Sequence, residues 1–356
     1  MSIGKVIQTF MIILFCLVVL EGLIAFSLYA PGAYQLIPIL AQDAVSRIYT
    51  KHVVQHISLL PECAQYDQET FYILKANSTC NYSNIEFDTT FSINSEGVRD
   101  DELALTEPRI IALGDSFTMG VGVEQDETFV ERLAALTGEN ILNAGISSFG
   151  TEREYLLLKR FDLSKLRIVI LQYSDNDFIE NAEAVRQKSL NIKSRSEYNR
   201  ISAKHLRKTK YFPFKFALGF FRDAFSSGIR IINRKIKAKT KAKTKAKTKA
   251  KTTAYLGEEV KNFLTIFAKI RQVAPSAKYI LTELNGLKRA RTAFLNSVNE
   301  YFVNDSLVSV IKIEDRASIS NYLPIDGHLN RSGHEFVAKG LAPLILQYLE
   351  EDESAR

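Results

Sequence analysis

From residue 109 onward, short apolar runs alternate with amphipathic stretches. The five runs are apolar at both odd and even positions, and they read RIIAL, ILNAG, RIVILQY, KYILTEL and SLVSVIKI. Helix-like segments follow them at 126–137, 151–161, 259–273, 290–302 and 332–349. Strands without polar alternation are typical of a parallel sheet that helices cover on both faces. We therefore expect an α/β domain with three layers, α/β/α.

The chain begins with a second kind of apolar stretch. Residues 6–30 carry one charged side chain, Glu21, to which we assign no role. At about 1.5 Å per residue, a helix of this length crosses a hydrocarbon core of roughly 30 Å. A cleaved signal peptide is the alternative, but the stretch is long for one and Pro31 follows it directly. We predict a transmembrane signal anchor, and Lys5 ahead of it places the rest of the chain on the extracytoplasmic side.

Three regions follow the predicted anchor. Residues 31–84 lack a long apolar period, and we interpret them as a stalk or small cap. The main domain is expected over 85–350, interrupted by an insertion at 180–254. The insertion ends in four copies of Lys-Ala-Lys-Thr at 237–252, which favour a solvated, disordered linker. The aromatic, basic stretch before this tract fits either an amphipathic segment on a membrane or a helical cap over the main domain.

The formal net charge of +6 belongs to that tract and not to the folded body. Nine lysines lie between Lys235 and Lys251, and without them the balance is negative. A basic tract alone is weak support for a nucleic-acid partner, and we expect none. Hydrophobic residues make up 46% and charged residues 24% of the chain, which excludes a wholly disordered protein.

Residues suited to acyl chemistry follow the predicted strands. Ser116 stands in a Gly-Asp-Ser tripeptide after the first core strand, at the edge where open α/β sheets bind ligands. Gly145 and Asn176 come at or just after the next two strands, and Asp326 and His328 precede the last helix. A parallel sheet brings all of these groups to one edge.

At these residues the chain resembles the SGNH (GDSL-type) hydrolase superfamily. The four blocks of that superfamily supply a nucleophilic Ser, an oxyanion Gly, an oxyanion Asn and a catalytic His, which match Ser116, Gly145, Asn176 and His328. The resemblance covers about 90–350 apart from the insertion, and it implies a flavodoxin-like fold and a serine esterase. The anchor, the Cys-bearing segment after it and the motif NSEGVR before the first block are similar to membrane-anchored bacterial members.

Two positions depart from the superfamily pattern. The third block usually reads Gly-x-Asn-Asp, and this chain has Ser174 at the glycine position. The fourth block is often Asp-x-x-His, but Ile325 stands three residues before His328. Asp326, two residues before the histidine, is therefore the predicted catalytic acid, with Asp315 as the fallback.

The resemblance implies a separate catalytic role for each of these residues. His328 takes the Ser116 proton and returns it to the leaving group, while Asp326 orients the imidazole. The N–H groups of Ser116 and Gly145 and the Asn176 amide hold the oxyanion. Asp115 is expected to brace the loop and not to react.

The remaining cysteines and histidines receive structural interpretations. In an oxidising compartment Cys63 and Cys80 would form a disulfide, and two buried free thiols are the alternative. His52 and His56 have the spacing of a helical metal pair but lack further ligands, so we expect surface positions. His334 is expected to begin one face of the last helix. We predict no metal and no cofactor.

The leading hypothesis is a membrane-anchored SGNH-type serine esterase with its catalytic domain in the periplasm. Its substrate would be an O-acyl ester, most simply an acetyl group on an envelope glycan or an acyl ester in a lipid. One alternative is an O-acyltransferase with the same triad that acts on an envelope polysaccharide. The other is a non-catalytic envelope or glycan-binding protein of the same fold. The sequence leaves the substrate and the oligomeric state open.

Overall fold

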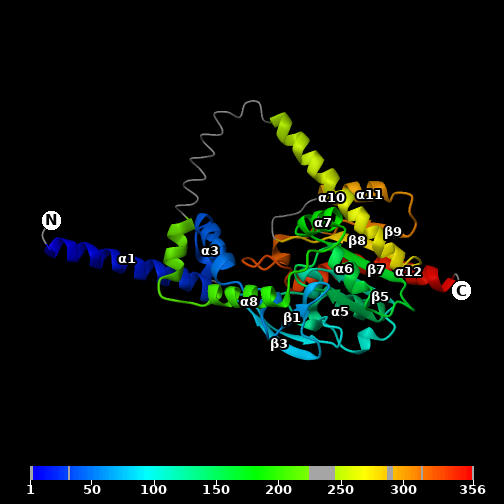
Figure 1. Cartoon of the computed structure of the whole chain (residues 1–356), viewed down its shortest axis with the longest axis horizontal. Helices are drawn as coiled ribbons and strands as arrows, with labels where there is room; N and C mark the ends of the chain where they lie inside the picture. The colour runs from blue at the N-terminus through cyan, green and yellow to red at the C-terminus, as the bar shows by residue number, and fades with distance from the viewer. Residues whose placement is uncertain (1–2, 31–32, 224–244, 287–291, 314–315, 355–356) are drawn as a thin grey trace. The chain divides into compact units, whose positions relative to one another are not determined.

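The computed structural model describes residues 3–30, 33–223, 245–286, 292–313 and 316–354 (Figure 1). It divides into two compact units. The smaller comprises Met1–Gln55 and Ala203–Ala250, and the larger comprises His56–Ser202 and Lys251–Arg356. The predicted stalk at 31–84 and the predicted insertion at 180–254 each contribute residues to both units.

The larger unit is built on a parallel sheet of five strands. In chain order these are β5 (Ile110–Gly114), β6 (Ile141–Gly145), β7 (Ile168–Tyr173), β8 (Lys278–Glu283) and β9 (Val308–Ile311). Their spatial order is β6-β5-β7-β8-β9, and every neighbouring pair is parallel. This is the flavodoxin-like order with its switch point beside β5, so the predicted fold class is confirmed.

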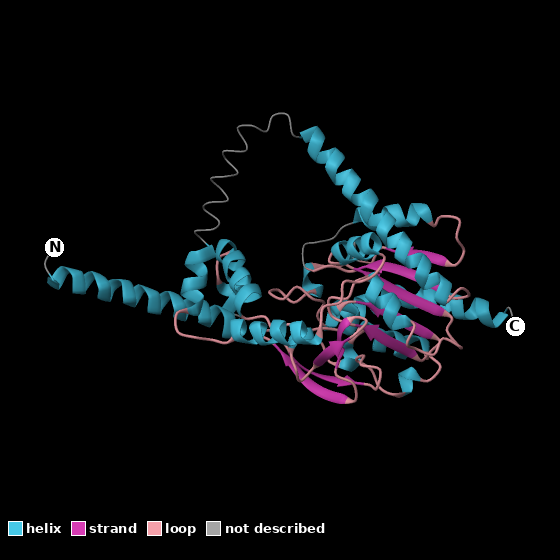
Figure 2. Cartoon of the chain, viewed as in Figure 1, coloured by secondary structure: helices cyan, strands magenta, loops and turns pink. Residues whose placement is uncertain are grey.

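Helices cover both faces of this sheet (Figure 2). On one face, α5 (Phe129–Thr137) and α12 (Arg331–Ser354) share a core with Ile110, Ile170 and Ile280. On the other lie α6 (Thr151–Leu158), α10 (Lys245–Val273) and α11 (Thr292–Tyr301). The Phe267 ring of α10 lies 5.1 Å from Tyr279, and Phe294 of α11 lies 4.0 Å from Tyr173. Burial on both faces explains why the strands lack polar alternation.

Before the sheet, the larger unit contains two antiparallel hairpins that the sequence analysis did not predict. They pair β1 (Ala64–Asp67) with β2 (Phe71–Leu74), and β3 (Ser78–Ser83) with β4 (Asp88–Ile93). Each of these strands has only four to six residues. In β4 the residues alternate between exposed and buried positions. Such short alternation is a weak signal in a polar stretch.

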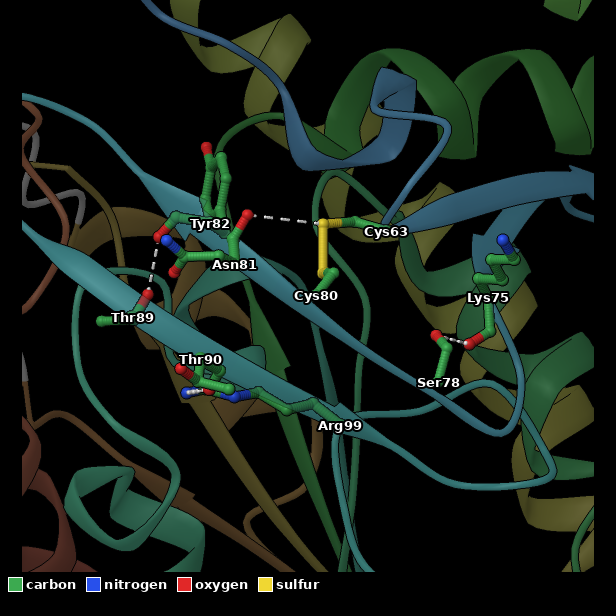
Figure 3. The surroundings of a disulfide bond; sticks show 9 residues. All are labelled: Cys63, Lys75, Ser78, Cys80, Asn81, Tyr82, Thr89, Thr90 and Arg99. Carbon is green, nitrogen blue, oxygen red and sulfur yellow. Dashed lines mark hydrogen bonds between the residues drawn. A yellow bond between two sulfur atoms is a disulfide. The ribbon is translucent and has the colours of Figure 1, made fainter.

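A disulfide joins the two hairpins. The structure bonds Cys63, which directly precedes β1, to Cys80 of β3, with the Cα atoms 5.3 Å apart. Figure 3 shows the bond beside β3 and β4, where the Thr89 hydroxyl donates a hydrogen bond to the Tyr82 carbonyl at 2.9 Å. Both cysteines are buried.

Three further helices and four 3₁₀ segments are described around the sheet. The helices are α4 (Ser116–Met119), α7 (Asp177–Gln187) and α8 (Arg195–Thr209), the last of which ends in the smaller unit. The 3₁₀ segments are η1 (Ile57–Leu59), η2 (Leu103–Leu105), η3 (Gln125–Glu127) and η6 (Ile319–Asn321).

The smaller unit contains α1 (Ile3–Tyr29), α2 (Ala33–Leu36), α3 (Ile39–His52) and a helix over residues 215–223. Within the described part of the chain, α1 alone is long and apolar enough to cross a membrane, with a mean hydropathy of 2.7 in its best window. A membrane anchor and a signal sequence both have these properties. The surface position predicted for His52 is wrong, because α3 packs against residues 215–223 and buries the ring.

The Lys-Ala-Lys-Thr tract falls partly on α10. Residues 237–244 lie outside the described residues. Residues 245–252 form the beginning of α10, where a disordered linker was expected. Alanine and lysine are both strong helix formers, which gives this end of the tract its helical preference.

Candidate active site

Ser116 lies where β5 ends and α4 begins, at the carboxyl edge of the sheet. Asp115 is the N-cap of α4, and its carboxylate accepts the Phe117 N–H at 3.0 Å. This contact joins the Asp115 side chain to the turn that carries the serine. Burial raises the pKa of Asp115 to about 6, against the lowering effect of the Phe117 N–H.

Ser116, His328 and Asp326 meet in one hydrogen-bonded chain. The Ser116 Oγ lies 2.7 Å from His328 Nε2, and His328 Nδ1 bonds Asp326 Oδ1. Burial by itself lowers the pKa of His328, but the charge and hydrogen bond of Asp326, with a smaller contribution from Asp115, raise it above 6.5. The imidazole is thus placed to accept the serine proton, with a carboxylate that stabilises the charged ring.

The short spacing between Asp326 and His328 depends on the glycine between them. Gly327 has φ of 87°, in the left-handed region that side chains other than glycine rarely adopt. The turn is closed by the Leu323 N–H, which donates to the His328 carbonyl at 2.8 Å, and by the Gly327 N–H, which donates to the Leu323 carbonyl at 3.0 Å. This backbone brings side chains two positions apart into contact.

The turn between β3 and β4 supports the same acid. Asn84 donates from Nδ2 to Asp326 Oδ2 at 3.0 Å, so His328 and Asn84 take different oxygens of the carboxylate. The Asn84 Oδ1 accepts the Glu86 N–H at 2.7 Å, which fixes the amide on both sides.

Glu86 binds the backbone N–H groups at Asp326. Its carboxylate accepts the Ile325 N–H at 3.0 Å and the Asp326 N–H at 2.5 Å. Burial raises the pKa of Glu86 to about 7, although these two backbone N–H groups lower it. The sequence analysis placed Asn84 in the predicted stalk and assigned no role to Glu86.

Arg99 braces the loop that follows the serine helix. The buried guanidinium lies 3.7 Å above the Phe91 ring and donates to the carbonyls of Gly120 at 2.6 Å and Val123 at 2.8 Å. It also donates to the Thr90 carbonyl on β4, the contact drawn in Figure 3. The NSEGVR motif, of which Arg99 is the last residue, thus ties the β3–β4 hairpin to the chain after Ser116.

The residues predicted for the oxyanion hole differ in their surroundings. Gly145 ends β6 beside α4, and a Cβ atom there would lie 2.2 Å from the Met119 backbone nitrogen, so only glycine fits. Its N–H donates to Asn143 Oδ1 at 3.1 Å. Asn176 is exposed at the N-cap of α7, and its side chain makes no capping bond there.

A pocket of about 250 Å³ lies against Asn176. Its other lining residues are Arg153, Ile179, Glu180, Glu183, Leu190, Asn191 and Ile192. Arg153 pairs with Glu180 at 2.9 Å on its wall. The pocket therefore offers both charged and apolar groups beside the predicted oxyanion amide.

Ser174, at the usual glycine position of the third block, is buried against Asn285. The Ser174 hydroxyl donates to Asn285 Oδ1 at 3.4 Å, and the Asp175 N–H donates to the same oxygen at 2.8 Å. Asn285 thus fixes the loop that leads to Asn176. A single asparagine after β8 gave no sequence signal for this contact.

Two buried acids lie behind the site. Glu154 is fully buried, and neither carboxyl oxygen has a hydrogen-bond partner among the described residues. Asp177 is buried beside it and accepts the Thr151 hydroxyl at 3.1 Å. Burial, reinforced by the charges of Asp115 and Glu180, raises the pKa of both carboxyls well above the ordinary values. Burial therefore favours the protonated form of both acids.

The hydrogen-bonded chain of Ser116, His328 and Asp326 does not include His334 or His56. His334 is buried in α12, and its Nδ1 accepts the Phe129 N–H at 3.1 Å. Burial lowers the pKa of His334 to about 3, so the ring stays a neutral acceptor. His56 is exposed, as predicted. Asp315 lies outside the described residues.

No protein-family model matches this chain, and no curated protein matches its sequence. A solved structure similar to it is a family two carbohydrate esterase from Clostridium thermocellum in complex with cellohexaose, with 13% identity and a TM-score of 0.39 over 68% of this chain and 65% of that one. A family 3 carbohydrate esterase from the same organism has 14% identity and a TM-score of 0.37, over 68% of this chain and 98% of that one. A protein from Desulfitobacterium hafniense, described as lipolytic and of the G-D-S-L family, has 14% identity and a TM-score of 0.34, over 65% of this chain and 98% of that one. At these identities and TM-scores the likenesses assign neither an activity nor residue roles to this chain.

Proposed function

We propose that the chain is a membrane-anchored serine esterase of the SGNH type that hydrolyses O-acyl esters. The observation that carries the proposal is the hydrogen-bonded chain from Ser116 through His328 to Asp326. A serine hydroxyl is a poor nucleophile until a base removes its proton, and this geometry supplies the base together with its orienting carboxylate. The raised pKa of His328 supports its double role as proton acceptor and donor.

The reaction divides into two displacements. In the first, His328 Nε2 takes the Ser116 proton while Oγ bonds the ester carbonyl carbon, and the histidine then protonates the leaving alcohol as its bond to that carbon breaks. In the second, water loses a proton to His328 and attacks the acyl-serine. The carboxylic acid leaves, and the proton returns to Ser116. Asp326 stays ionised throughout and stabilises the imidazolium.

The proposed oxyanion hole consists of the Ser116 and Gly145 N–H groups and the Asn176 side chain. Gly145 can contribute its N–H by sharing it between the oxyanion and Asn143, or by releasing Asn143. Asn176 lies open beside the pocket, as an amide that meets a substrate must. One oxyanion donor is typically worth about 3 to 4 kcal/mol of barrier.

A short acyl group is the substrate that the site supports best. The pocket beside Asn176 holds about 250 Å³, which suits an acetyl group or a single sugar ring better than a long acyl chain. Its charged and amide groups favour a polar leaving group, so we propose an acetylated envelope glycan. Two of the similar structures are carbohydrate esterases by name.

The proposed location is the extracytoplasmic side of the cytoplasmic membrane. The length and hydropathy of α1 support an anchor, and the Cys63–Cys80 disulfide supports an oxidising compartment. In this proposal α1 spans the membrane once and the larger unit lies in the periplasm.

Release of p-nitrophenol from acetyl, butyryl and octanoyl esters tests the proposal. The full chain in detergent is compared with Ser116→Ala, and thermal unfolding shows whether both are folded. We expect turnover that is highest for acetyl and absent in Ser116→Ala. Equal turnover by the two proteins would exclude the serine mechanism. Turnover that appears only with an acceptor glycan would show that the protein is an acyltransferase, which passes the acyl group to the glycan and not to water.

A further inference from the structure

Glu21, the one charged residue of the apolar stretch 6–30, has a partner in the insertion. It is buried on α1, and its Oε2 accepts the Ala217 N–H at 2.7 Å. Ala217 lies in the first turn of the helix over residues 215–223, where backbone N–H groups lack helical partners. The carboxylate therefore caps a helix that is almost 200 residues away in sequence.

The same helix packs on the end of α1 and on α3. Phe216 and Ala217 are buried, and the Phe216 ring lies 6.1 Å from that of Tyr29. Lys215 donates to the His52 carbonyl at 2.6 Å, and Asp223 pairs with Lys51 at 2.7 Å. The segment over 203–223 is thus part of the folded smaller unit and is built onto α1.

A cleaved signal sequence does not fit these contacts. Four residues of α1 are buried, and all lie in its second half: Glu21, Ile24, Ser27 and Leu28. Cleavage after α1 would remove these side chains and leave the N-terminus of the 215–223 helix without its cap. The packing therefore favours an α1 that remains in the mature protein.

Part of the exposed surface of this segment is apolar and aromatic. Its exposed large hydrophobic side chains are Tyr211 at 53%, Phe212 at 52%, Leu218 at 55% and Phe221 at 52%. Leu218 and Phe221 are three positions apart and share one face of the helix. They belong to the same packed unit as Phe26 of α1, which is 60% exposed.

Basic residues accompany these aromatics. Residues 203–223 contain six lysines and arginines and one acidic residue, Asp223. Aromatic side chains beside Lys and Arg are typical of segments at a membrane interface, where rings enter the head-group region and cations meet anionic lipids. A cap over a soluble domain would bury the rings instead.

The length of α1 places this segment at the right depth. Its 27 residues span roughly 40 Å, and the hydrocarbon core takes about 30 Å. The last two turns, which carry the buried Ile24, Ser27 and Leu28, thus extend into the head-group region, and Glu21 lies just before them.

We infer that residues 203–223 form an interfacial collar, docked on α1 through Glu21, whose aromatic side chains enter the outer leaflet of an anionic bilayer. The inference rests on the membrane anchoring in the proposed function. It assigns Glu21 the role of holding the collar to the anchor, and it assigns this part of the insertion to lipid binding.

The chain contains no tryptophan, so single tryptophans can report on each position. Phe212→Trp and Phe221→Trp test the collar, and Leu103→Trp, at a residue 76% exposed in the larger unit, is the control. The full chain is reconstituted in phosphatidylcholine and phosphatidylglycerol vesicles, with and without brominated acyl chains. We expect brominated lipid to quench the collar tryptophans and aqueous iodide to spare them, with the reverse for Leu103→Trp.

Iodide quenching of the collar tryptophans equal to that of Leu103→Trp would overturn the inference. Protection from both quenchers would also overturn it, because the covering partner would then be protein. In a Phe221→Trp background, Glu21→Leu should expose the tryptophan to iodide, while Glu21→Gln, which keeps an acceptor oxygen, should not. Equal behaviour of the two Glu21 variants would remove the role given to Glu21.

Two further readouts separate this inference from the proposed function. Ester turnover by the same vesicles reports on the triad alone, so intact turnover without lipid quenching overturns only the collar. Extraction of the full chain by alkaline carbonate would show that α1 is no anchor, and the collar would fall with it.

Discussion

Asn84 Nδ2 lies 3.0 Å from Asp326 Oδ2, although 242 residues separate the two in sequence. The contact ties the turn of the β3–β4 hairpin to the acid that orients His328. Hydrogen bonds to charged groups contribute more than neutral ones, about 1.5 to 3 kcal/mol each. In the proposed mechanism the hairpin therefore serves as a positioning element.

Replacement of Asn84 tests this relationship. Asn84→Ala should lower kcat about tenfold with little change in KM, because Asp326 loses one of the groups that hold it. Asn81→Ala, in the same hairpin but bonded to the exposed Asp88, is the matched control and should keep full activity. Asn84→Asp adds a negative charge near the triad and should move the acid limb of the pH profile to higher pH. An unmoved acid limb would reduce Asn84 to a structural residue.

Glu86 should add its own step to the pH profile. Its pKa is raised to about 7, so below neutral pH it takes up a proton and holds the Ile325 and Asp326 N–H groups less strongly. His328 becomes protonated in the same direction, and the wild-type kcat/KM should fall more steeply than one ionisation allows. Glu86→Gln should show a lower plateau and a single-ionisation slope. Equal slopes in the two proteins would show that Glu86 does not act on the reaction.

Glu154 should make the protein less stable as the pH rises. Burial raises the pKa of Glu154 well above the ordinary value of 4.5, so folding favours its protonated form. The free energy of unfolding then falls between about pH 4.5 and the folded pKa. The gain of Glu154→Gln over wild type should therefore grow as the pH rises above about 4.5.

Denaturant unfolding at several pH values in detergent measures this difference. Glu62→Gln, at an exposed position, is the control and should show no such trend. A gain that is the same at pH 4 and pH 7 would mean that Glu154 is ionised in the folded protein.

The disulfide should support both stability and activity. Cys63 and Cys80 are 17 positions apart, and closing such a loop contributes about 3 kcal/mol in the chain-entropy account. Reduction with dithiothreitol should lower the melting temperature and, because β3 leads to Asn84, also kcat. The double variant Cys63→Ser, Cys80→Ser should have the melting temperature and kcat of the reduced protein, and dithiothreitol should change neither. An oxidised protein no more stable than this variant would contradict the assigned bond.

The sequence predicted the parts of the structure that follow a strong local pattern. The five core strands are apolar at both odd and even positions because helices cover both faces of the sheet, and this pattern predicted the fold class. The blocks around Ser116 and His328 are short motifs at strand ends, and the structure brings their side chains into contact. Their catalytic roles stay predictions until activity is measured.

The rest depended on contacts between distant segments. Asn84 and Glu86 lie in a polar turn, and only the folded hairpin brings them to Asp326. His52 has the spacing of a surface pair on α3, but residues from the insertion cover it. Glu21 is an isolated acid in an apolar stretch, and its partner Ala217 offers only a backbone N–H, which no side-chain pattern reveals.

Trapping of the acyl-enzyme tests the central claim most directly. The full chain is mixed with p-nitrophenyl acetate, quenched in acid and digested, and the peptides are analysed by mass spectrometry. We expect one acetyl group on Ser116, less of it in His328→Ala, and none at that position in Ser116→Ala. Acetyl groups only on other residues, or turnover that persists in Ser116→Ala, would contradict the assignment of Ser116 as the nucleophile.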